Sequence, residues 1–230
     1  IEGGNKVSVD ERMVHDIVQK VMANMQISGS VSGMHGVFKD MNDAINASIE
    51  AQKKVCTMTL DQREQIISLI RKKTHENAEI LANMGVNETG MGNVGDKILK
   101  HHLTADKVPG TEDISTIAWS GDRGLTLVEM GPFGVIGAIT PATNPSETVI
   151  CNCIGMLAGG NTVVFNPHPN AKKTTIYTIN MINEASIEAG GPDNIAVSVE
   201  APTLDTSAIM MKHPSIHLLV ATGGPGVVTA

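Results

Sequence analysis

The sequence predicts an α/β protein in which helices cover a doubly wound parallel sheet, with a further helical layer from the N-terminal half. Through the first half, apolar residues recur three and four positions apart, which is the period of amphipathic helices. After residue 133, short β-branched runs alternate with helix-length stretches. Repeats of this kind favour parallel strands joined by right-handed crossovers.

The composition excludes several classes of function. The 230 residues carry a formal net charge of −7 and show no basic stripe, which excludes nucleic-acid binding by phosphate neutralisation. No apolar run reaches the roughly 18 residues of a membrane span. The three cysteines include Cys151 and Cys153, whose spacing suits neither a structural zinc site nor an unstrained disulfide. We therefore expect reduced thiols and a cytoplasmic protein.

Residues 1–33 are predicted to form an amphipathic helix followed by a flexible linker. Ser8 and Glu11 fit a capping box, and Ser28–Gly33 has the composition of a linker. One interpretation is a helix that docks on its own domain. The other, which the linker favours, is a tethered peptide in residues 8–25 that docks on a partner. The apolar face of this helix comprises Val14, Ile17, Val18, Val21, Met22 and Met25.

Residues 34–116 are predicted to be a helical layer without strands. A first helical face begins near Val37 and includes Phe38. A second helix begins at Thr59, and a third helical stretch precedes a turn at Asn87–Gly92. Helical periodicity then resumes over Val94–Leu103.

Residues 117–131 are predicted to form a hairpin. Two β-type runs, Ile117–Ser120 and Leu125–Met130, flank the turn Gly121–Gly124.

Residues 132–230 are predicted to form the parallel α/β core. The expected strands are Val135–Ile139, Thr162–Phe165, Ile195–Val199 and Ile216–Val220. The expected helices between them are Ser146–Leu157, Ala171–Ala189 and Thr203–Met211. The glycines 131, 134 and 137 precede or occupy the first of these strands, so we interpret them as packing residues and not as a phosphate loop.

Three polar turns follow predicted strands, namely Thr140–Pro145, Asn166–Pro169 and Thr222–Gly226. Carboxyl ends of parallel strands share one edge of a sheet, where ligands bind in open α/β folds. We therefore expect the three turns to meet in one cleft. Gly223 and Gly224 would let backbone N–H groups approach a phosphate at the start of the next helix.

Two side chains in these turns have alternative roles. The Asn144 amide is either an oxyanion donor or a cap of the following helix, and the local sequence favours the cap. His168, between two prolines, is either a binding contact or a solvated loop histidine.

Other reactive side chains do not predict chemistry. Cys151 and Cys153 have apolar neighbours, which indicates packing and not nucleophilic catalysis. The pair His101–His102 lacks carboxylate or Cys partners at ligand spacing, so a metal site is not expected.

Taken together, the motifs resemble the aldehyde dehydrogenase superfamily, and within it the CoA-acylating propionaldehyde and acetaldehyde dehydrogenases of bacterial microcompartments. The resemblance extends from about Val37 to the end of the chain and rests on several motifs in the same order. These are Asn87–Gly92, Gly131–Pro141, Ala158–Pro169 and Leu219–Gly226. Residues 1–33 resemble the encapsulation peptide that tethers such enzymes inside a protein shell.

The resemblance implies oxidation of a short aldehyde to an acyl-CoA, with NAD and coenzyme A as cofactors. In this family a Cys thiolate attacks the aldehyde, an Asn side chain and the Cys backbone N–H hold the oxyanion, hydride passes to NAD, and CoA cleaves the acyl-enzyme. Asn144 is then the implied catalytic residue. Thr143 is the alternative, because an ungapped comparison places the Asn of hydrolytic members at that position.

The resemblance also implies a set of cofactor-binding residues. Hydrolytic members hold the adenosine ribose with Lys-Pro-Ser and a nearby Glu, and Asn166–Pro169 lacks both. This difference favours the acylating branch and looser dinucleotide recognition, with NAD and NADP as alternatives. The implied residues are Thr140, Pro141, Ala142, Thr143, Pro167, His168, Thr222, Gly223 and Gly224.

The nucleophilic Cys of the family follows the segment after Thr222–Gly226, and none of the three cysteines here matches it. We therefore interpret residues 34–230 as helical part, hairpin and core of a cofactor-binding domain that precedes a catalytic domain. The alternative is a catalytically inactive fragment or interaction protein associated with a microcompartment shell. The hairpin resembles the family's oligomerisation segment, so we expect a homo-oligomer. A shell protein is the expected partner of residues 8–25, with the protein inside a microcompartment.

Overall fold

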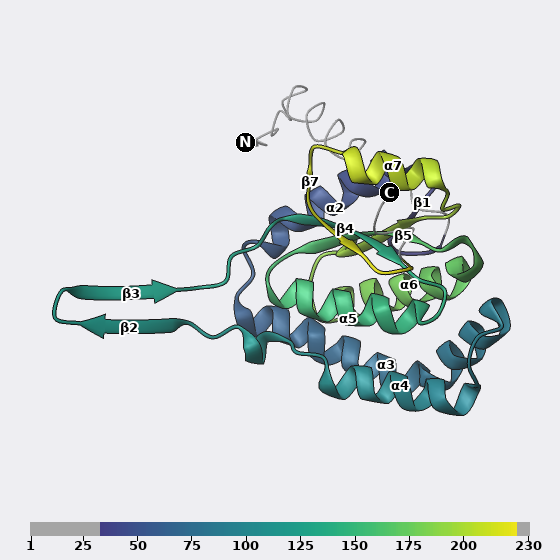
Figure 1. The fold of residues 1–230 in the computed structure, drawn as a ribbon, viewed down its shortest axis with the longest axis horizontal. Helices are drawn as coiled ribbons and strands as arrows, with labels where there is room; N and C mark the ends of the chain where they lie inside the picture. The colour runs from purple at the N-terminus through teal and green to yellow at the C-terminus, as the bar shows by residue number, and fades with distance from the viewer. Residues whose placement is uncertain (1–32, 225–230) are drawn as a thin grey trace, which may run out of the picture.

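The computed structural model describes residues 33–224, which form a five-stranded parallel sheet and a separate two-stranded hairpin (Figure 1). The expectations for residues 1–32 and 225–230, including the targeting helix and most of its linker, lie outside the described residues. The sheet strands are β1 (Val37–Phe38), β4 (Val135–Thr140), β5 (Thr162–Pro167), β6 (Ala196–Val199) and β7 (Ile216–Ala221). The helices are α2 (Met41–Val55), α3 (Leu60–Thr89), α4 (Val94–Lys107), α5 (Pro145–Ala158), α6 (Lys172–Glu188) and α7 (Leu204–Lys212). Two short 3-10 turns lie at Thr111–Asp113 and Pro169–Ala171.

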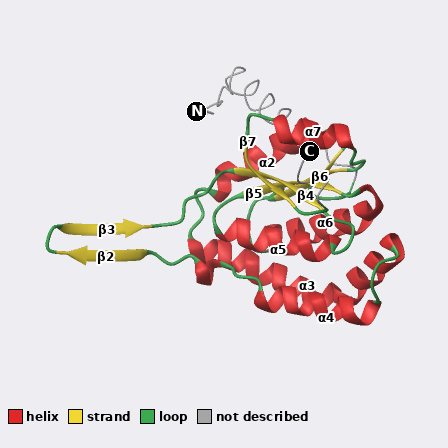
Figure 2. Ribbon diagram, in the orientation of Figure 1, coloured by secondary structure: helices red, strands yellow, loops and turns green. Residues whose placement is uncertain are grey.

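Helices cover both faces of the sheet, as the sequence predicts (Figure 2). On one face, α2 and α7 enclose a small apolar cluster that includes Phe38, Ile45 and Met210. On the other face, α5 and α6 pack on the strands, and α3 with α4 forms a further layer outside them. The prediction of a doubly wound sheet with an added helical layer is confirmed.

The strand order β1-β6-β5-β4-β7 gives the sheet a topological switch point. From β4 the chain moves outward through β5 to β6, and it then returns through α7 to place β7 on the other side of β4. In open α/β sheets, such a reversal leaves a crevice at the carboxyl ends of the strands. Here that crevice lies between the ends of β4 and β7.

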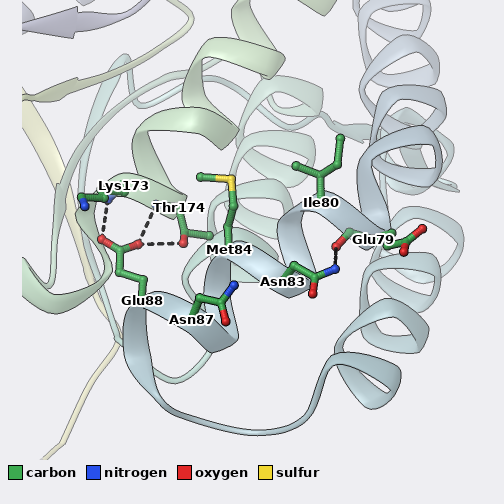
Figure 3. Close-up of a pocket in the computed structure, with 8 residues that line it drawn as sticks. All are labelled: Glu79, Ile80, Asn83, Met84, Asn87, Glu88, Lys173 and Thr174. Carbon is green, nitrogen blue, oxygen red and sulfur yellow. Dashed lines mark hydrogen bonds between the residues drawn. The ribbon is translucent and has the colours of Figure 1, made fainter.

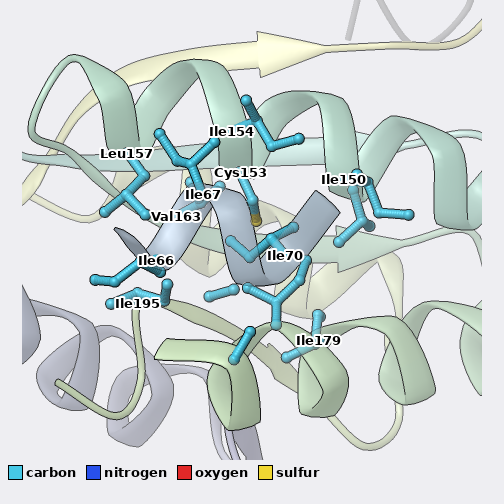
Figure 4. Packing of buried hydrophobic residues seen from close by; sticks show 14 of the residues in the cluster. Ile66, Ile67, Ile70, Ile150, Cys153, Ile154, Leu157, Val163, Ile179 and Ile195 are labelled. Carbon is cyan, nitrogen blue, oxygen red and sulfur yellow. The ribbon is translucent and has the colours of Figure 1, made fainter. Parts of the chain in front are cut away.

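The larger core lies between the sheet, α5, α6 and the N-terminal half of α3 (Figure 4). Its residues are almost entirely aliphatic, because the chain contains only three Phe, one Tyr and one Trp. The residues of α3 and α5 that meet here are Ile66, Ile67, Ile70, Ile150, Cys153, Ile154 and Leu157.

Two details of the predicted helical layer are wrong. Val37 and Phe38 are not helical but form the edge strand β1, paired with Ser198 and Val199 of β6. The helix starts later because the Asp40 carboxylate accepts the backbone N–H of Asn42 at 2.8 Å and so caps α2. A two-residue strand has no period that sequence patterning can detect.

The second and third predicted helical stretches are one continuous helix, α3. The Thr59–Gln62 capping box starts it, and Gly90 ends it with the left-handed φ of 69°. Residues 87–89, predicted as part of a turn, therefore belong to the last turn of α3.

The hairpin consists of β2 (Ile117–Gly121) and β3 (Gly124–Val128), close to the predicted strands. It projects away from the rest of the molecule (Figure 1), and all of its strand residues are exposed. A two-stranded hairpin without a packed face is at best marginally stable in water. Its apolar side chains therefore face solvent in the single chain, with Trp119 58% exposed.

Of the three glycines predicted to be packing residues, Gly134 and Gly137 are confirmed, whereas Gly131 is exposed and an added Cβ there would have nothing within 4 Å. A Cβ atom at Gly137 would lie 2.9 Å from Leu219 Cδ2 and 3.1 Å from Ile216 Cγ2, so any side chain there would force these β7 side chains to move. At Gly134, with a φ of +111°, a Cβ atom would meet the His217 ring.

Within residues 33–224, each helix is too short or too polar to cross a bilayer.

Candidate functional site

A cavity of about 470 Å³ opens at the carboxyl edge of the sheet, over the switch point. The ends of β4, β5 and β7 form its floor, and residues from the start to the end of α7 form a wall. Three turns that are far apart in sequence therefore meet in one place, as predicted. All nine residues expected to bind the cofactor line it: Thr140, Pro141, Ala142, Thr143, Pro167, His168, Thr222, Gly223 and Gly224.

Sequence reasoning missed the wall that α7 contributes. Thr203, Leu204, Ser207 and Met211 line the cavity, and Leu204 is 89% exposed. A leucine this exposed at the mouth of a cavity offers an apolar surface to a flat ligand. No local pattern marks these residues, because their place at the cavity depends on how α7 packs against the strands.

Thr140, the last residue of β4, has a polar atom without a partner. Its side chain is 1% exposed, yet Oγ1 forms no hydrogen bond with any described residue. Buried hydroxyls are normally paired, because an unpaired one costs about 1–3 kcal/mol. Since Thr140 also lines the cavity, this atom fits a ligand that donates or accepts a hydrogen bond at the strand end.

His168 has an exposed side chain in the same cavity. Its Nδ1 accepts the backbone N–H of Asn170 at 3.2 Å and so caps the short 3-10 turn that precedes α6. The neutral ring then carries its proton on Nε2. One ring nitrogen thus fixes the loop, while the other faces away from that bond.

Asn166 occupies the position where hydrolytic relatives were expected to have Lys. Its Oδ1 accepts the Thr206 hydroxyl at 2.7 Å, and its Nδ2 donates to the Thr203 carbonyl at 3.4 Å. The side chain thus ties the end of β5 to the first turn of α7. It helps to place the wall of the cavity.

The favoured local interpretation of Asn144, a side-chain cap of α5, is wrong. Asn144 occupies the N-cap position, but its side chain makes no capping hydrogen bond. Its Oδ1 instead accepts from Lys100 Nζ at 3.3 Å, while its backbone carbonyl accepts the Thr148 hydroxyl at 2.7 Å. Asn144 is not among the residues that line the cavity; it lies beside it in the same turn.

We call residues 140–147, which join β4 to α5, the lip of the cavity. Helix α4 holds the lip through a buried network. Lys97 Nζ donates to the Thr143 carbonyl at 2.9 Å and lies 3.3 Å from Glu147 Oε1. His101 Nε2 lies 2.8 Å from the Ser146 hydroxyl, and its Nδ1 lies 2.7 Å from the Lys97 carbonyl.

Burial lowers the pKa of His101, with a smaller opposing effect of the Glu147 charge. The neutral imidazole is therefore the stable form at pH 7, with the Nδ1 proton donated to the Lys97 carbonyl. Its Nε2 then accepts from the Ser146 hydroxyl.

The cysteines of α5 are packing residues, as predicted. Burial raises the pKa of the Cys153 thiol strongly, and burial followed by the Glu147 charge raises that of Cys151. Both thiols stay protonated at neutral pH, and only a thiolate is an effective nucleophile. Among residues 33–224, no cluster of three or more His, Cys, Asp or Glu side chains is arranged to hold a metal ion.

A second cavity, of about 570 Å³, lies between the end of α3 and the start of α6 (Figure 3). The Glu88 carboxylate lies in its lining. This group accepts the backbone N–H of Lys173 at 2.7 Å, the backbone N–H of Thr174 at 2.8 Å and the Thr174 hydroxyl at 2.7 Å. Glu88 thus caps α6 from a different helix, and we assign it a structural role.

The fold and the cavity define a doubly wound α/β protein with its candidate site at the switch point. Comparison with known proteins names the family. Residues 11–229 match the model of the aldehyde dehydrogenase family, and the chain belongs to this family.

Individual relatives come from its acylating branch. The chain is 46% identical over 227 residues to an acetaldehyde dehydrogenase (acetylating) of Bilophila wadsworthia, a match that covers 95% of this chain and 46% of the relative. It is 73% identical to the propionaldehyde dehydrogenase from the fucose utilisation bacterial microcompartment of Clostridium phytofermentans, with a TM-score of 0.83. That match covers 85% of this chain and 45% of the solved structure.

A propionaldehyde dehydrogenase of Rhodopseudomonas palustris, solved with bound propionyl-CoA, is 46% identical with a TM-score of 0.82. That match covers 84% of this chain and 43% of the solved chain. The chain thus spans less than half the length of the relatives it matches.

Proposed function

We propose that these residues are the cofactor-binding part of an NAD-dependent, CoA-acylating aldehyde dehydrogenase. The observation that carries the proposal is the convergence of three strand-end turns in one cavity at the switch point, with every residue expected to bind the cofactor in its lining. The overall reaction balances as aldehyde, NAD⁺ and CoA giving acyl-CoA, NADH and one proton. The relatives carry the names of enzymes of this kind. Their names therefore support the enzyme and not the alternative of an inactive interaction protein.

The residues that line the cavity fit a dinucleotide. When bound, the nicotinamide supplies the acceptor for the hydride that leaves the aldehyde carbon. The exposed Leu204 offers an apolar wall to an aromatic ring, and the unpaired Thr140 hydroxyl offers a hydrogen bond at the floor. Gly223 and Gly224 leave the backbone open to close approach by phosphate.

We further propose Asn144 as the oxyanion donor, with Thr143 as the alternative. Both residues belong to the lip, and the Asn144 amide presents a free NH₂ group once Lys100 occupies its oxygen. Removal of one such donor typically lowers kcat by about 10²–10³. We expect Asn144→Ala to lower kcat by that factor with a much smaller change in KM. An unchanged kcat would transfer the role to Thr143, to be tested by Thr143→Val.

The reaction is tested with the native polypeptide that carries these residues. Purified protein is given propionaldehyde and NAD⁺, with and without CoA, and both NADH and acyl-CoA are quantified. The proposal expects NADH and acyl-CoA in equal amounts and little NADH without CoA. NADH release that is indifferent to CoA contradicts the acylating assignment. Intact mass of the native polypeptide separates the enzyme from the inactive alternative, which expects a chain of this length only.

We propose that a second copy of the chain covers the hairpin, which serves as the oligomerisation segment. The support is its exposed apolar surface, with Leu125 and Leu127 both more than half exposed. Such surfaces on a projecting hairpin mark protein interfaces. Leu125→Glu together with Leu127→Glu should reduce the oligomer mass measured by analytical ultracentrifugation. An unchanged mass would refute this role.

We also propose that residues 8–25 recruit the protein to a microcompartment shell. The support is the amphipathic pattern followed by a Ser/Gly linker, and similarity to a microcompartment enzyme. Fusion of residues 1–33 to a fluorescent reporter should bring the reporter into shells. A reporter that stays outside contradicts the proposal, and Val18→Glu in the same fusion is the control for the apolar face.

A further inference from the structure

Three side chains of α4 reach the lip from one helix face. Lys97, Lys100 and His101 lie at positions i, i+3 and i+4, which are neighbours on an α-helix. They contact four lip residues in the order Thr143, Asn144, Ser146 and Glu147. The lip is thus held by α4, a helix that contributes no residue to the lining of the cavity.

Lys97 fixes the backbone of the lip. Its side chain is only 4% exposed, and its ammonium group is placed between the Thr143 carbonyl and the Glu147 carboxylate. An ammonium group removed from water requires acceptors of fixed geometry. One of its acceptors lies before Pro145 and the other after it, so Lys97 bridges the end of the turn to the first turn of α5.

Lys100 is exposed, like Lys107, and it differs from Lys107 in contacting the Asn144 side chain. An ammonium group can only donate, so the atom that faces Lys100 Nζ at 3.3 Å is the amide oxygen. The NH₂ group is then directed away from Lys100 and is available as a donor.

We propose that Lys97 and Lys100 are positioning residues for the oxyanion donor of the lip. Lys97 sets the path of the turn, and Lys100 sets the direction of the Asn144 amide. The inference deepens the proposed function and rests on it for the role of the lip. It predicts that a helix outside the cavity controls kcat without controlling cofactor binding.

The test uses the native polypeptide with Lys100→Met, Lys100→Arg and a matched control, Lys107→Met, which alters an exposed lysine in the last turn of the same helix. We expect Lys100→Met to lower kcat by up to about 10²-fold, the effect that a misplacement of about 1 Å can have. The KM for NAD⁺ and the melting temperature should stay within error of those of Lys107→Met. Lys100→Arg should restore most of the lost kcat. A kcat of Lys100→Met within twofold of the control overturns the role of Lys100.

A second readout does not depend on activity. Amide hydrogen exchange of residues 140–148 is measured by mass spectrometry in Lys97→Met, Lys100→Met and Lys107→Met. Exchange that rises more in the lip than in α2 in the first two variants supports the positioning role, because a purely global loss of stability would raise exchange in both segments. Exchange equal to that of Lys107→Met overturns it. If the unsubstituted protein forms no acyl-CoA, the proposed function fails, and this measurement still decides whether α4 positions the lip.

Discussion

The ammonium nitrogen of Lys97 lies 3.3 Å from Glu147 Oε1, and the two side chains are only 4% and 7% exposed. A buried ion pair of this kind adds little net stability compared with an apolar pair, because both charges lose their hydration. Its effect is on geometry. The pair joins α4 to α5 at one position beneath the lip. Because both side chains are buried, water cannot solvate one charge if the other is removed.

Loss of one partner should be costly. Lys97→Met leaves the Glu147 carboxylate buried without its cation, and we expect the free energy of unfolding to fall by about 3–5 kcal/mol. Urea denaturation measures this loss. The double variant Lys97→Met/Glu147→Leu should recover most of it, since no charge then remains buried. A double variant as unstable as the single one contradicts this account of the pair.

Acid should weaken the same region through His101. Burial holds the pKa of His101 below its ordinary value of 6.5, so the unfolded chain binds a proton more readily than the folded one. His101 therefore does not change the free energy of unfolding above about pH 6.5, and it lowers this free energy as the pH falls below that value. The Glu147 charge opposes the shift, and the Lys97 and His102 charges add to it.

We therefore expect the melting temperature to fall between pH 7.5 and 5.5, and less steeply in His101→Gln. The loss is about 1.4 kcal/mol for each pH unit that separates the two pKa values. Equal slopes in both proteins would assign the pH dependence to other groups.

A side chain at Gly137 should lower the stability of the protein. In Gly137→Ala the new Cβ would meet Leu219, Ile216 and Met210 at 2.9, 3.1 and 3.3 Å. Overpacking of a tight core typically costs about 1–3 kcal/mol. Thermal unfolding should show this loss. Gly131→Ala is the matched control, because a Cβ there has nothing within 4 Å; a similar loss in both variants would refute packing as the cause.

Thr140→Val should have opposite effects on stability and on cofactor affinity. The substitution removes a buried hydroxyl that has no described partner, so the protein without cofactor should be as stable or slightly more stable. If the hydroxyl bonds to the dinucleotide, the Kd for NAD⁺ should rise by about five- to tenfold, the effect of one lost hydrogen bond. Isothermal titration calorimetry and thermal unfolding measure the two quantities.

Thr162→Val is the matched control for this substitution. Thr162 lies on the adjacent strand, and its hydroxyl lies 2.9 Å from the Ser48 hydroxyl. Its loss should lower stability by about 1–3 kcal/mol, because Ser48 is left unpaired, and should leave the affinity for NAD⁺ unchanged. Loss of stability in Thr140→Val equal to that in Thr162→Val would show that the Thr140 hydroxyl is already paired.

The sequence alone predicts the parallel core well, for a physical reason. Runs such as Val135–Ile139 are β-branched and bounded by Gly and Pro, so strand ends are visible locally and the shared edge follows from parallel topology. The meeting of the three turns could be predicted in this way, whereas the nine individual cavity residues were implied by the family resemblance. Thr203 and Leu204 were missed because a helix wall depends on how α7 packs, which no local pattern encodes.

Asn144 also shows that local sequence cannot predict contacts made by packing between distant segments. Local sequence favours a helix cap, since Asn before Pro at the first helical position is a common N-cap arrangement. The structure instead places Lys100, 44 residues away in the chain, against the amide oxygen. Likewise, the support given by Lys97 and His101 arises from helix packing and has no signature in the spacing of the residues.

The projecting hairpin gives the protein an intrinsic optical probe. Trp119 is the single tryptophan among the 230 residues, and it lies on β2 instead of in the core. The fluorescence of Trp119 therefore reports the surroundings of the hairpin and is insensitive to the packing of the sheet. A blue shift of that emission with rising protein concentration would follow the covering of the hairpin directly, without any label.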